Sequence, residues 1–191
     1  LYTRLGFAHE ATGWLTFGAA WDARRRLVVP RSIDGLLLDL GCGEGRLLAR
    51  FNRRGIAAIG IEPSATMSRR ARQAGLTIVR ASAQALPLRS DCFLHIVCTY
   101  PGPWIIDQAT WDEIDRISKP GMTVTILLGG DLGRVNRFSP RRLIMRMAYG
   151  DAHRASAPPG LGSARIRGEH CYVEDAWGTA ILWKGSYCDI D

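Results

Sequence analysis

The chain lacks any apolar run that approaches the roughly 20 residues of a membrane-spanning helix, and no basic and apolar leader precedes its body. It is also poor in cysteine and histidine, with 5 and 4 residues. The cysteines are odd in number and form no C-x-x-C pair, which argues against a disulfide framework or a zinc site and predicts free thiols in a cytoplasmic protein. The histidines have no metal-ligand spacing either, so the sequence predicts no metal site.

Lysine is nearly absent. Lys119 and Lys184 are the only two, and the other basic residues of this chain of net charge +7 are arginines. Such a charge would suit an acidic partner, but the arginines are scattered, and the tightest runs, 24–26 and 141–142, are expected on exposed helix faces. Because nucleic-acid footprints cluster on one face, a solvated surface is favoured and no nucleic-acid partner is expected.

From residue 36 onward, short apolar runs alternate with amphipathic stretches. The apolar runs predict strands at 36–40, 57–61, 77–80, 94–99 and 122–128. The amphipathic stretches predict helices at 44–54, at 64–74 with Ser64 as its cap, and at 107–118. This alternation predicts an α/β fold, a Rossmann-like, doubly wound and mostly parallel sheet with helices on both faces. Residues 164–173 and 176–187 predict an antiparallel hairpin at its edge, turning at Glu174-Asp175.

The length of 191 residues suits a single domain. Residues 31–191 are expected to form its α/β core and residues 1–30 a helical preface. The preface is rich in aromatic side chains, namely Tyr2, Trp14, Phe17 and Trp21. It can act as a lid that excludes water from a site, or simply pack on the sheet, and the sequence leaves both alternatives open.

Residues 36–51, LLLDLGCGEGRLLARF, place three glycines between a predicted buried strand and a predicted helix. Glycine adopts backbone angles closed to other residues and lets a ligand approach without a Cβ in the way. In open α/β sheets, ligands bind at the carboxyl ends of the strands, where the strand order reverses. The next predicted strand ends at Glu62, and a carboxylate about 20 residues after such a turn can accept hydrogen bonds from ribose hydroxyls. The pattern predicts a nucleoside-binding site.

The glycine spacing G-x-G-x-G differs from the dinucleotide fingerprint G-x-G-x-x-G, and Asp39 stands two positions before the first glycine. A pyrophosphate needs the N–H groups of a helix end, whereas a ligand with an amino-acid end needs a carboxylate for its ammonium group. Asp39 can supply that charge, directly or through water. The spacing therefore disfavours a nicotinamide-dependent oxidoreductase.

Four segments resemble the class I S-adenosylmethionine-dependent methyltransferases, and more narrowly the type 11 group that includes the ubiquinone and menaquinone C-methyltransferases. DLGCGEG (39–45) resembles the first motif of that family, and GIEPSATMSRRAR (60–72) resembles its acidic strand end and following helix. ASAQALPLRSDCF (81–93) resembles the loop after the third strand, and EIDRISKPGM (113–122) resembles the helix-to-strand segment. The segments stand in the family's order, and the resemblance covers about residues 36–130.

The resemblance implies the class I methyltransferase fold and S-adenosylmethionine as the cofactor. It implies that Asp39, Gly41 and Gly43 surround the methionine part of that cofactor and that Cys42 offers its backbone. It also implies that Glu62 accepts hydrogen bonds from the two ribose hydroxyls.

On the adenine side, the resemblance implies that Pro63 borders the base. The family usually places Asp or Asn in the third-strand loop to accept from the adenine amino group, whereas this chain has Ser82, followed by Ala83, whose N–H would face the ring. A hydroxyl accepts without charge, so weaker or water-mediated recognition is expected. Leu94 stands where the family commonly has an aspartate of structural role, and Met67 can contact the adenine or face the core.

The segment TYPGPW (99–104) follows the fourth predicted strand and is expected to face the transferable methyl group. Tyr100 can line the cofactor or contact the acceptor, with Trp104 as a wall, although the prolines can also make a simple rigid turn. The segment lacks the Asp/Asn-Pro-Pro-Tyr sequence that amino-group methyltransferases acting on DNA or protein often carry. A small-molecule acceptor is therefore favoured.

The sequence thus predicts an enzyme, an S-adenosylmethionine-dependent methyltransferase. Methyl transfer mainly requires that donor and acceptor are aligned, and a base is needed only if the acceptor must lose a proton. His9, His170 and Asp131 are candidates for such a base, none is singled out, and His95 is expected to be packed within its strand. The alternatives are a cofactor-binding module without turnover and a nucleic-acid or protein methyltransferase. Neither the acceptor nor the oligomeric state is specified by the sequence.

Overall fold

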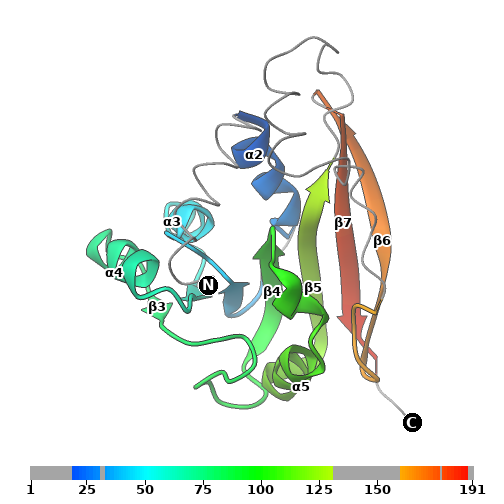
Figure 1. The fold of residues 1–191 in the computed structure, drawn as a ribbon. Helices are drawn as coiled ribbons and strands as arrows, with labels where there is room; N and C mark the ends of the chain where they lie inside the picture. The colour runs from blue at the N-terminus through cyan, green and yellow to red at the C-terminus, as the bar shows by residue number, and fades with distance from the viewer. Residues whose placement is uncertain (1–18, 31–32, 131–159, 177, 189–191) are drawn as a thin grey trace.

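The structure is a computed structural model that describes residues 19–30, 33–130, 160–176 and 178–188. Among these residues, seven strands form one sheet in the order β3-β2-β1-β4-β5-β7-β6 (Figure 1). The strands are β1 (Leu37–Leu40), β2 (Ala58–Ile61), β3 (Ile78–Val79), β4 (Phe93–Thr99), β5 (Ser118–Gly130), β6 (Ile166–Asp175) and β7 (Gly178–Tyr187). The first five are parallel, and β7 is antiparallel to both of its neighbours.

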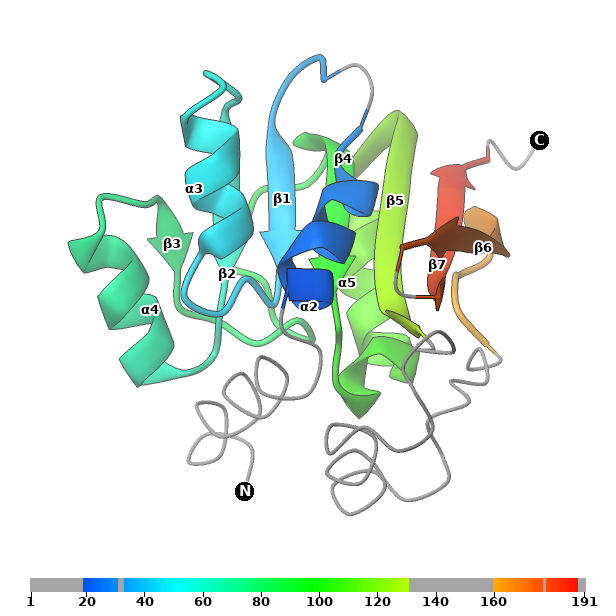
Figure 2. The same cartoon turned by 90° about the horizontal axis from the view of Figure 1, so that it is seen from above.

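Helices cover both faces of the sheet, as predicted. They are α2 (Ala19–Arg24), the 3₁₀ helix η1 (Arg25–Val28), α3 (Arg46–Asn52), α4 (Ala65–Gln73), the 3₁₀ helix η2 (Pro103–Ile106) and α5 (Gln108–Ile117). Figure 2 shows α2 and α3 in front of the sheet and α5 behind it. No helix among the described residues is long and apolar enough to span a membrane.

Each face has its own hydrophobic core. On the α5 face, Trp111 and Ile114 pack with Trp183 of β7, and the two indole rings meet edge to face at a centroid distance of 5.3 Å. On the other face, Phe51 of α3 and Val28 of η1 pack against the strands. Because β1 is buried along its whole length, its residues form a nearly continuous apolar run, as expected of a central parallel strand.

The strand order reverses between β1 and β4. From β1 the chain proceeds outward to β2 and β3, then crosses back to pair β4 with the other side of β1. In such sheets, ligands bind outside the carboxyl ends of the strands at this reversal. The glycine turn that follows Leu40 lies there, as the sequence predicted for this turn.

The structure confirms the predicted elements but moves three boundaries. The helix predicted at 44–54 is only α3, because the turn extends to Gly45. The strand predicted from residue 122 starts at Ser118, which pairs with Phe93 across a register shift. The hairpin was expected to turn at Glu174-Asp175, but Asp175 is the last residue of β6 and pairs with Gly178, whose N–H its carboxylate accepts at 3.0 Å.

Candidate functional site

The glycine turn between β1 and α3 is fixed by backbone bonds to the end of β2. The N–H groups of Gly41 and Cys42 both donate to the carbonyl of Ile61, at 2.9 and 3.0 Å. Gly41 and Gly43 have φ of +74° and +58°, a region that side chains with a Cβ rarely adopt. The turn therefore needs glycine for its own conformation, in addition to any ligand.

The side chain of Glu62 belongs to this turn. One carboxylate oxygen accepts the N–H of Gly43 at 3.0 Å, and the other accepts the N–H of Ser64 at 2.8 Å. The residue is 7% exposed, and it lines a cavity above the turn. Ser64 caps α4 by accepting the N–H of Met67 at 3.4 Å, as predicted.

Asp39 is the least satisfied acidic side chain that the described residues contain. It lies in β1 on the same face as Leu37, toward η1 and α3, and is 1% exposed. Neither carboxylate oxygen has a hydrogen-bond partner. Burial raises the pKa of Asp39 from 3.8 to about 7, the nearby charge of Arg25 lowers it, and that of Glu62 raises it further.

A cavity of about 480 Å³ opens above the turn, within the range of about 300–1,000 Å³ that small-molecule sites occupy. It is lined by every predicted cofactor-binding residue except Asp39, which lies beneath it: Gly41, Cys42, Gly43, Glu62, Pro63, Ser82, Ala83 and Tyr100. Met67 also lines it, which favours the cavity-facing alternative for that residue. Burial raises the pKa of the Cys42 thiol, so Cys42 contributes no charge here.

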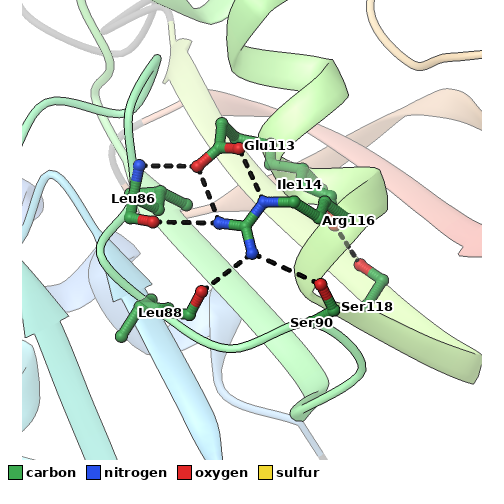
Figure 3. A network of polar contacts seen from close by, with 7 residues as sticks. All are labelled: Leu86, Leu88, Ser90, Glu113, Ile114, Arg116 and Ser118. Carbon is green, nitrogen blue, oxygen red and sulfur yellow. Dashed lines mark hydrogen bonds and ion pairs between the residues drawn. The ribbon is translucent and has the colours of Figure 1, made fainter.

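The loop that carries residues 82–83 is held by α5. Glu113 accepts the N–H of Leu86 at 2.6 Å, and Arg116 donates to the carbonyls of Leu86 and Leu88 at 2.9 and 2.8 Å. Figure 3 shows the guanidinium group between this loop and the Glu113 carboxylate. The hydrogen bond from Arg116 holds the pKa of Glu113 below its ordinary value. The network fixes one wall of the cavity from outside it.

Two aromatic residues after β4 form the opposite wall. Tyr100 has a φ of +53°, a conformation that costs about 1–3 kcal/mol and clusters at functional sites. The phenol is neutral near pH 7, as an ordinary phenol is, and burial raises its pKa further. The ring of Trp104 lies so close to Gly41 that a Cβ there would be 3.1 Å from it. Pro103 is the first residue of the 3₁₀ helix η2, and both Pro101 and Pro103 also line the cavity.

Sequence reasoning missed the contribution of α2 and η1 to the cavity. Trp21 and Arg25 both line it, and the Trp21 indole stacks on the Tyr100 ring at 3.6 Å and 5°. The arginine run 24–26 was expected to be exposed, but Arg24 is buried and Arg25 is half-buried, which leaves only Arg26 on the surface. The aromatic content of the preface was the one available signal, since Trp21 is among its members.

Of the candidate bases, only His170 lies among the described residues, and it does not line the cavity. His170 lies in β6, and its buried Nε2 has no hydrogen-bond partner. His95 is hydrogen-bonded to Thr123 across the strands at 3.0 Å, as expected. His9 and Asp131 lie outside the described residues, as do Tyr2, Trp14 and Phe17 of the preface.

Comparison with known proteins shows which proteins this chain is similar to. Residues 37–121 match the model of the methyltransferase domain family. An uncharacterized methyltransferase of Mycobacterium leprae (strain Br4923) is 31% identical over 140 residues, which cover 64% of this chain and 51% of that protein. One of Mycobacterium tuberculosis (strain ATCC 25618 / H37Rv) is 27% identical over 119 residues, covering 56% and 49%. The chain spans about half the length of these curated relatives.

Solved structures resemble the chain over nearly all its length. An S-adenosylmethionine-dependent methyltransferase from Thermotoga maritima has a TM-score of 0.60 at 16% identity and covers 97% of this chain and 98% of its own. The methyltransferase crystallised with the Trm112 activator of Haloferax volcanii has a TM-score of 0.61 at 18% identity, covering 100% and 96%. At such identities the likeness concerns the fold. The chain is therefore similar to the methyltransferase domain family over residues 37–121, and it has the fold of the S-adenosylmethionine-dependent methyltransferase structure that it resembles.

Proposed function

We propose that this chain binds S-adenosylmethionine in the cavity above the glycine turn and transfers its methyl group to a small molecule. The observation that carries the proposal is the buried carboxylate of Asp39, which has no hydrogen-bond partner. Such a group is unfavourable unless a cation approaches it, because burial disfavours the charged form. The ammonium group of the methionine moiety is a cation of the right kind.

The other end of the cavity suits adenosine. The two Glu62 oxygens are oriented by the N–H groups of Gly43 and Ser64, and the side chain lines the cavity, where we propose that it accepts hydrogen bonds from the ribose hydroxyls. We propose that Pro63 and Met67 border the adenine and that Ser82 and Ala83 contact its polar edge. The loop carrying Ser82 is fixed by α5, so this contact needs no rearrangement of the loop.

Bound S-adenosylmethionine would supply an activated methyl group on a sulfonium, which needs no metal or base to leave. The residues of this chain would then align the acceptor and exclude water, and alignment alone can supply about 7–11 kcal/mol of a barrier. Tyr100 is neutral near pH 7, as an ordinary phenol is, and burial raises its pKa further, so it can donate a hydrogen bond but does not serve as a base. We propose Tyr100 and Trp104 as the wall beside the transferred methyl group.

Isothermal titration calorimetry tests the binding part of the proposal. We expect the chain to bind S-adenosylmethionine and its demethylated product, S-adenosylhomocysteine, and not NAD. Tight binding of NAD with none of S-adenosylhomocysteine would refute it. Methyl transfer over a panel of small-molecule acceptors, with DNA and a protein as controls, then tests the activity.

A binding module without turnover is the second candidate, and two observations favour keeping it. His170, the one candidate base among the described residues, does not line the cavity, and the same fold occurs in the [4+2]-cyclase SpnF, with a TM-score of 0.59 at 16% identity and 89% coverage of this chain. Cofactor binding without methyl release on the full panel would support that candidate.

We further propose a relationship to the type 11 group, a single domain over residues 1–191 and a cytoplasmic location. The first is supported by the Lys-Pro-Gly segment at 119–121, the second by the chain length, and the third by five free cysteines. No nucleic-acid partner is proposed.

A further inference from the structure

An ion pair between residues that are 151 positions apart in the sequence joins helix α2 to the end of strand β6. Arg24 donates from Nε to one oxygen of Asp175 at 2.6 Å and from Nη2 to the other at 3.1 Å. The two side chains are 2% and 16% exposed. This is a two-pronged geometry in a water-poor place, which makes the pair directional and poorly screened by salt.

The neighbouring strands β5 and β7 leave space for the Arg24 side chain. A Cβ on Gly130, at the end of β5, would lie 2.4 Å from an Nη atom of Arg24 and 2.6 Å from the carbonyl of Thr179. Only glycine leaves room for the guanidinium group there. Asp175 is also held, because one of its oxygens accepts the N–H of Gly178 at 3.0 Å.

Helix α2 depends on such contacts for its position. It has six residues, and an isolated helix of that length is unstable in water. A second ion pair, between Arg50 and Asp22, has a distance of 3.1 Å, and the Asp22 side chain is 43% exposed, so it contributes little. The Tyr100 hydroxyl donates to the Trp21 carbonyl at a long 3.4 Å. The Arg24–Asp175 pair is shorter and more buried than either of these two contacts.

The residues that α2 and η1 place in the cavity lie at its Asp39 end. Arg25 follows Arg24 directly, and its charge acts on Asp39. Trp21 is stacked on Tyr100, and the Arg25 guanidinium group lies over the Trp21 ring, 5.6 Å from the centroid of that ring. A shift of α2 would therefore alter the methionine end of the proposed site and leave the Glu62 end in place.

We propose that Arg24 and Asp175 are a pair of positioning residues that fix Trp21 and Arg25 against the methionine end of the cofactor cavity. The inference rests on the proposed function. It assigns the C-terminal hairpin, which does not line the cavity, a role in cofactor affinity.

The test uses two ligands that share adenosine but differ in the amino-acid end. Binding of S-adenosylhomocysteine and of 5′-methylthioadenosine, which lacks the amino and carboxylate groups, is measured by calorimetry well below the melting temperature of each variant. Arg24→Gln and Asp175→Asn should each weaken S-adenosylhomocysteine roughly 10-fold or more and 5′-methylthioadenosine less than about 2-fold. The double variant should lose no more than either single variant, since both remove one interaction.

Arg167→Gln is the matched control, because Arg167 is an exposed arginine of β6, the same strand as Asp175. It should change neither affinity. Arg24→Lys keeps the charge but not the two-pronged bond, and an intermediate loss is expected. It also serves as the second variant if Arg24→Gln fails to fold.

The outcomes separate the two proposals. If Arg24→Gln lowers only the melting temperature, or weakens both ligands equally, the pair is structural and the positioning role is refuted. If the wild-type protein binds neither ligand, the proposed function itself is refuted, and the positioning role with it.

Discussion

Asp39 and Glu113 are carboxylates on opposite sides of one sheet, and the chain treats them in opposite ways. Glu113, on α5, accepts from a backbone N–H and from Arg116, and its pKa is lowered. Asp39, in β1, is fully buried without a hydrogen bond, and its pKa is raised to about 7. The first arrangement stabilises the folded chain by itself, whereas the second costs free energy until a cation arrives.

The difference separates a network that stabilises the fold from the cavity that we propose to bind the ligand. Around Glu113 the polar groups are satisfied by the chain, as buried groups in stable proteins are. The carboxyl ends of β1 and β4 have an acid without a hydrogen-bond partner among the described residues, and a strained backbone at Tyr100. Backbone strain of this kind clusters at functional sites, which supports the proposed ligand site.

The largest expected effect comes from Asp39→Asn. At pH 8 the wild-type carboxylate is ionised against a pKa of about 7, compared with 3.8 for the ordinary group. That shift corresponds to a destabilisation of about 4 kcal/mol, which the Asn variant avoids, while burying its unpaired amide costs about 1–3 kcal/mol. The free energy of unfolding of the variant should therefore exceed that of wild type by about 1–3 kcal/mol. Urea denaturation of the ligand-free protein at pH 8 measures this.

The effect of Asp39→Asn on the free energy of unfolding depends on pH. An acid with a raised folded pKa destabilises progressively between its unfolded pKa and its folded pKa, here from about pH 3.8 to about 7. The advantage of the Asn variant should therefore vanish near pH 4. The same variant should bind S-adenosylhomocysteine roughly 10–100-fold more weakly. A variant that is less stable at pH 8 and binds normally would contradict our reading of Asp39.

Glu62→Ala should have the next largest effect, on binding. It removes charge-assisted hydrogen bonds to the ribose and the anchor of the Gly43 N–H, and should weaken S-adenosylmethionine binding by about 1.5–3 kcal/mol. Calorimetry at constant pH measures it. Glu44→Ala is the matched control, since Glu44 lies in the same turn but pairs with the exposed Arg70 outside the cavity. Equal losses in the two variants would place the effect in the turn and not at the ribose.

Glu113→Gln should lower stability and leave binding nearly unchanged. It weakens the bonds to Arg116 and the Leu86 N–H, for a loss of about 1–2 kcal/mol in the free energy of unfolding at pH 7. Because the pKa of Glu113 is lowered, its contribution is present above its ordinary pKa of 4.5 and disappears as the pH falls below that value. Denaturation at pH 7 and pH 4 checks both parts. A large loss of S-adenosylhomocysteine binding would remove the distinction between the two regions.

The pH dependence of binding is the smallest expected effect. A ligand that requires ionised Asp39 should bind roughly 10-fold more weakly at pH 6 than at pH 8, given a pKa of about 7 in the free protein. Binding should also release protons, which calorimetry in buffers of different ionisation enthalpy detects. Asp39→Asn should bind weakly at both pH values. A flat profile in wild type would indicate that a group other than Asp39 pairs with the ammonium.

The parts of the fold and site that the sequence predicted are those set by local pattern. Gly41, Gly43 and Glu62 form one turn at the reversal of strand order, and periodicity and spacing sufficed to find them. The hairpin turn was misplaced because Glu174-Asp175 resembled a turn, although Gly178, with a φ of +138°, was the stronger signal. Gly178 is the first residue of β7 and pairs with Asp175 at the end of the hairpin.

The α2 wall could not be found in this way. Arg24 meets its partner 151 positions away, and Tyr100 meets Trp21 across 79 positions. A run of three arginines looks the same in sequence whether it faces water or a carboxylate. Only tertiary structure shows that the first is buried, the second borders the cavity and the third is exposed.

The bond between Arg24 and Asp175 also sets the order of events during translation. The ribosome releases Arg24 long before Asp175, which is the last residue of β6 and follows all five parallel strands. A nascent chain can thus form its glycine turn before α2 is fixed in place. The proposed contribution of α2 to ligand affinity would then be acquired only after β6 has been made.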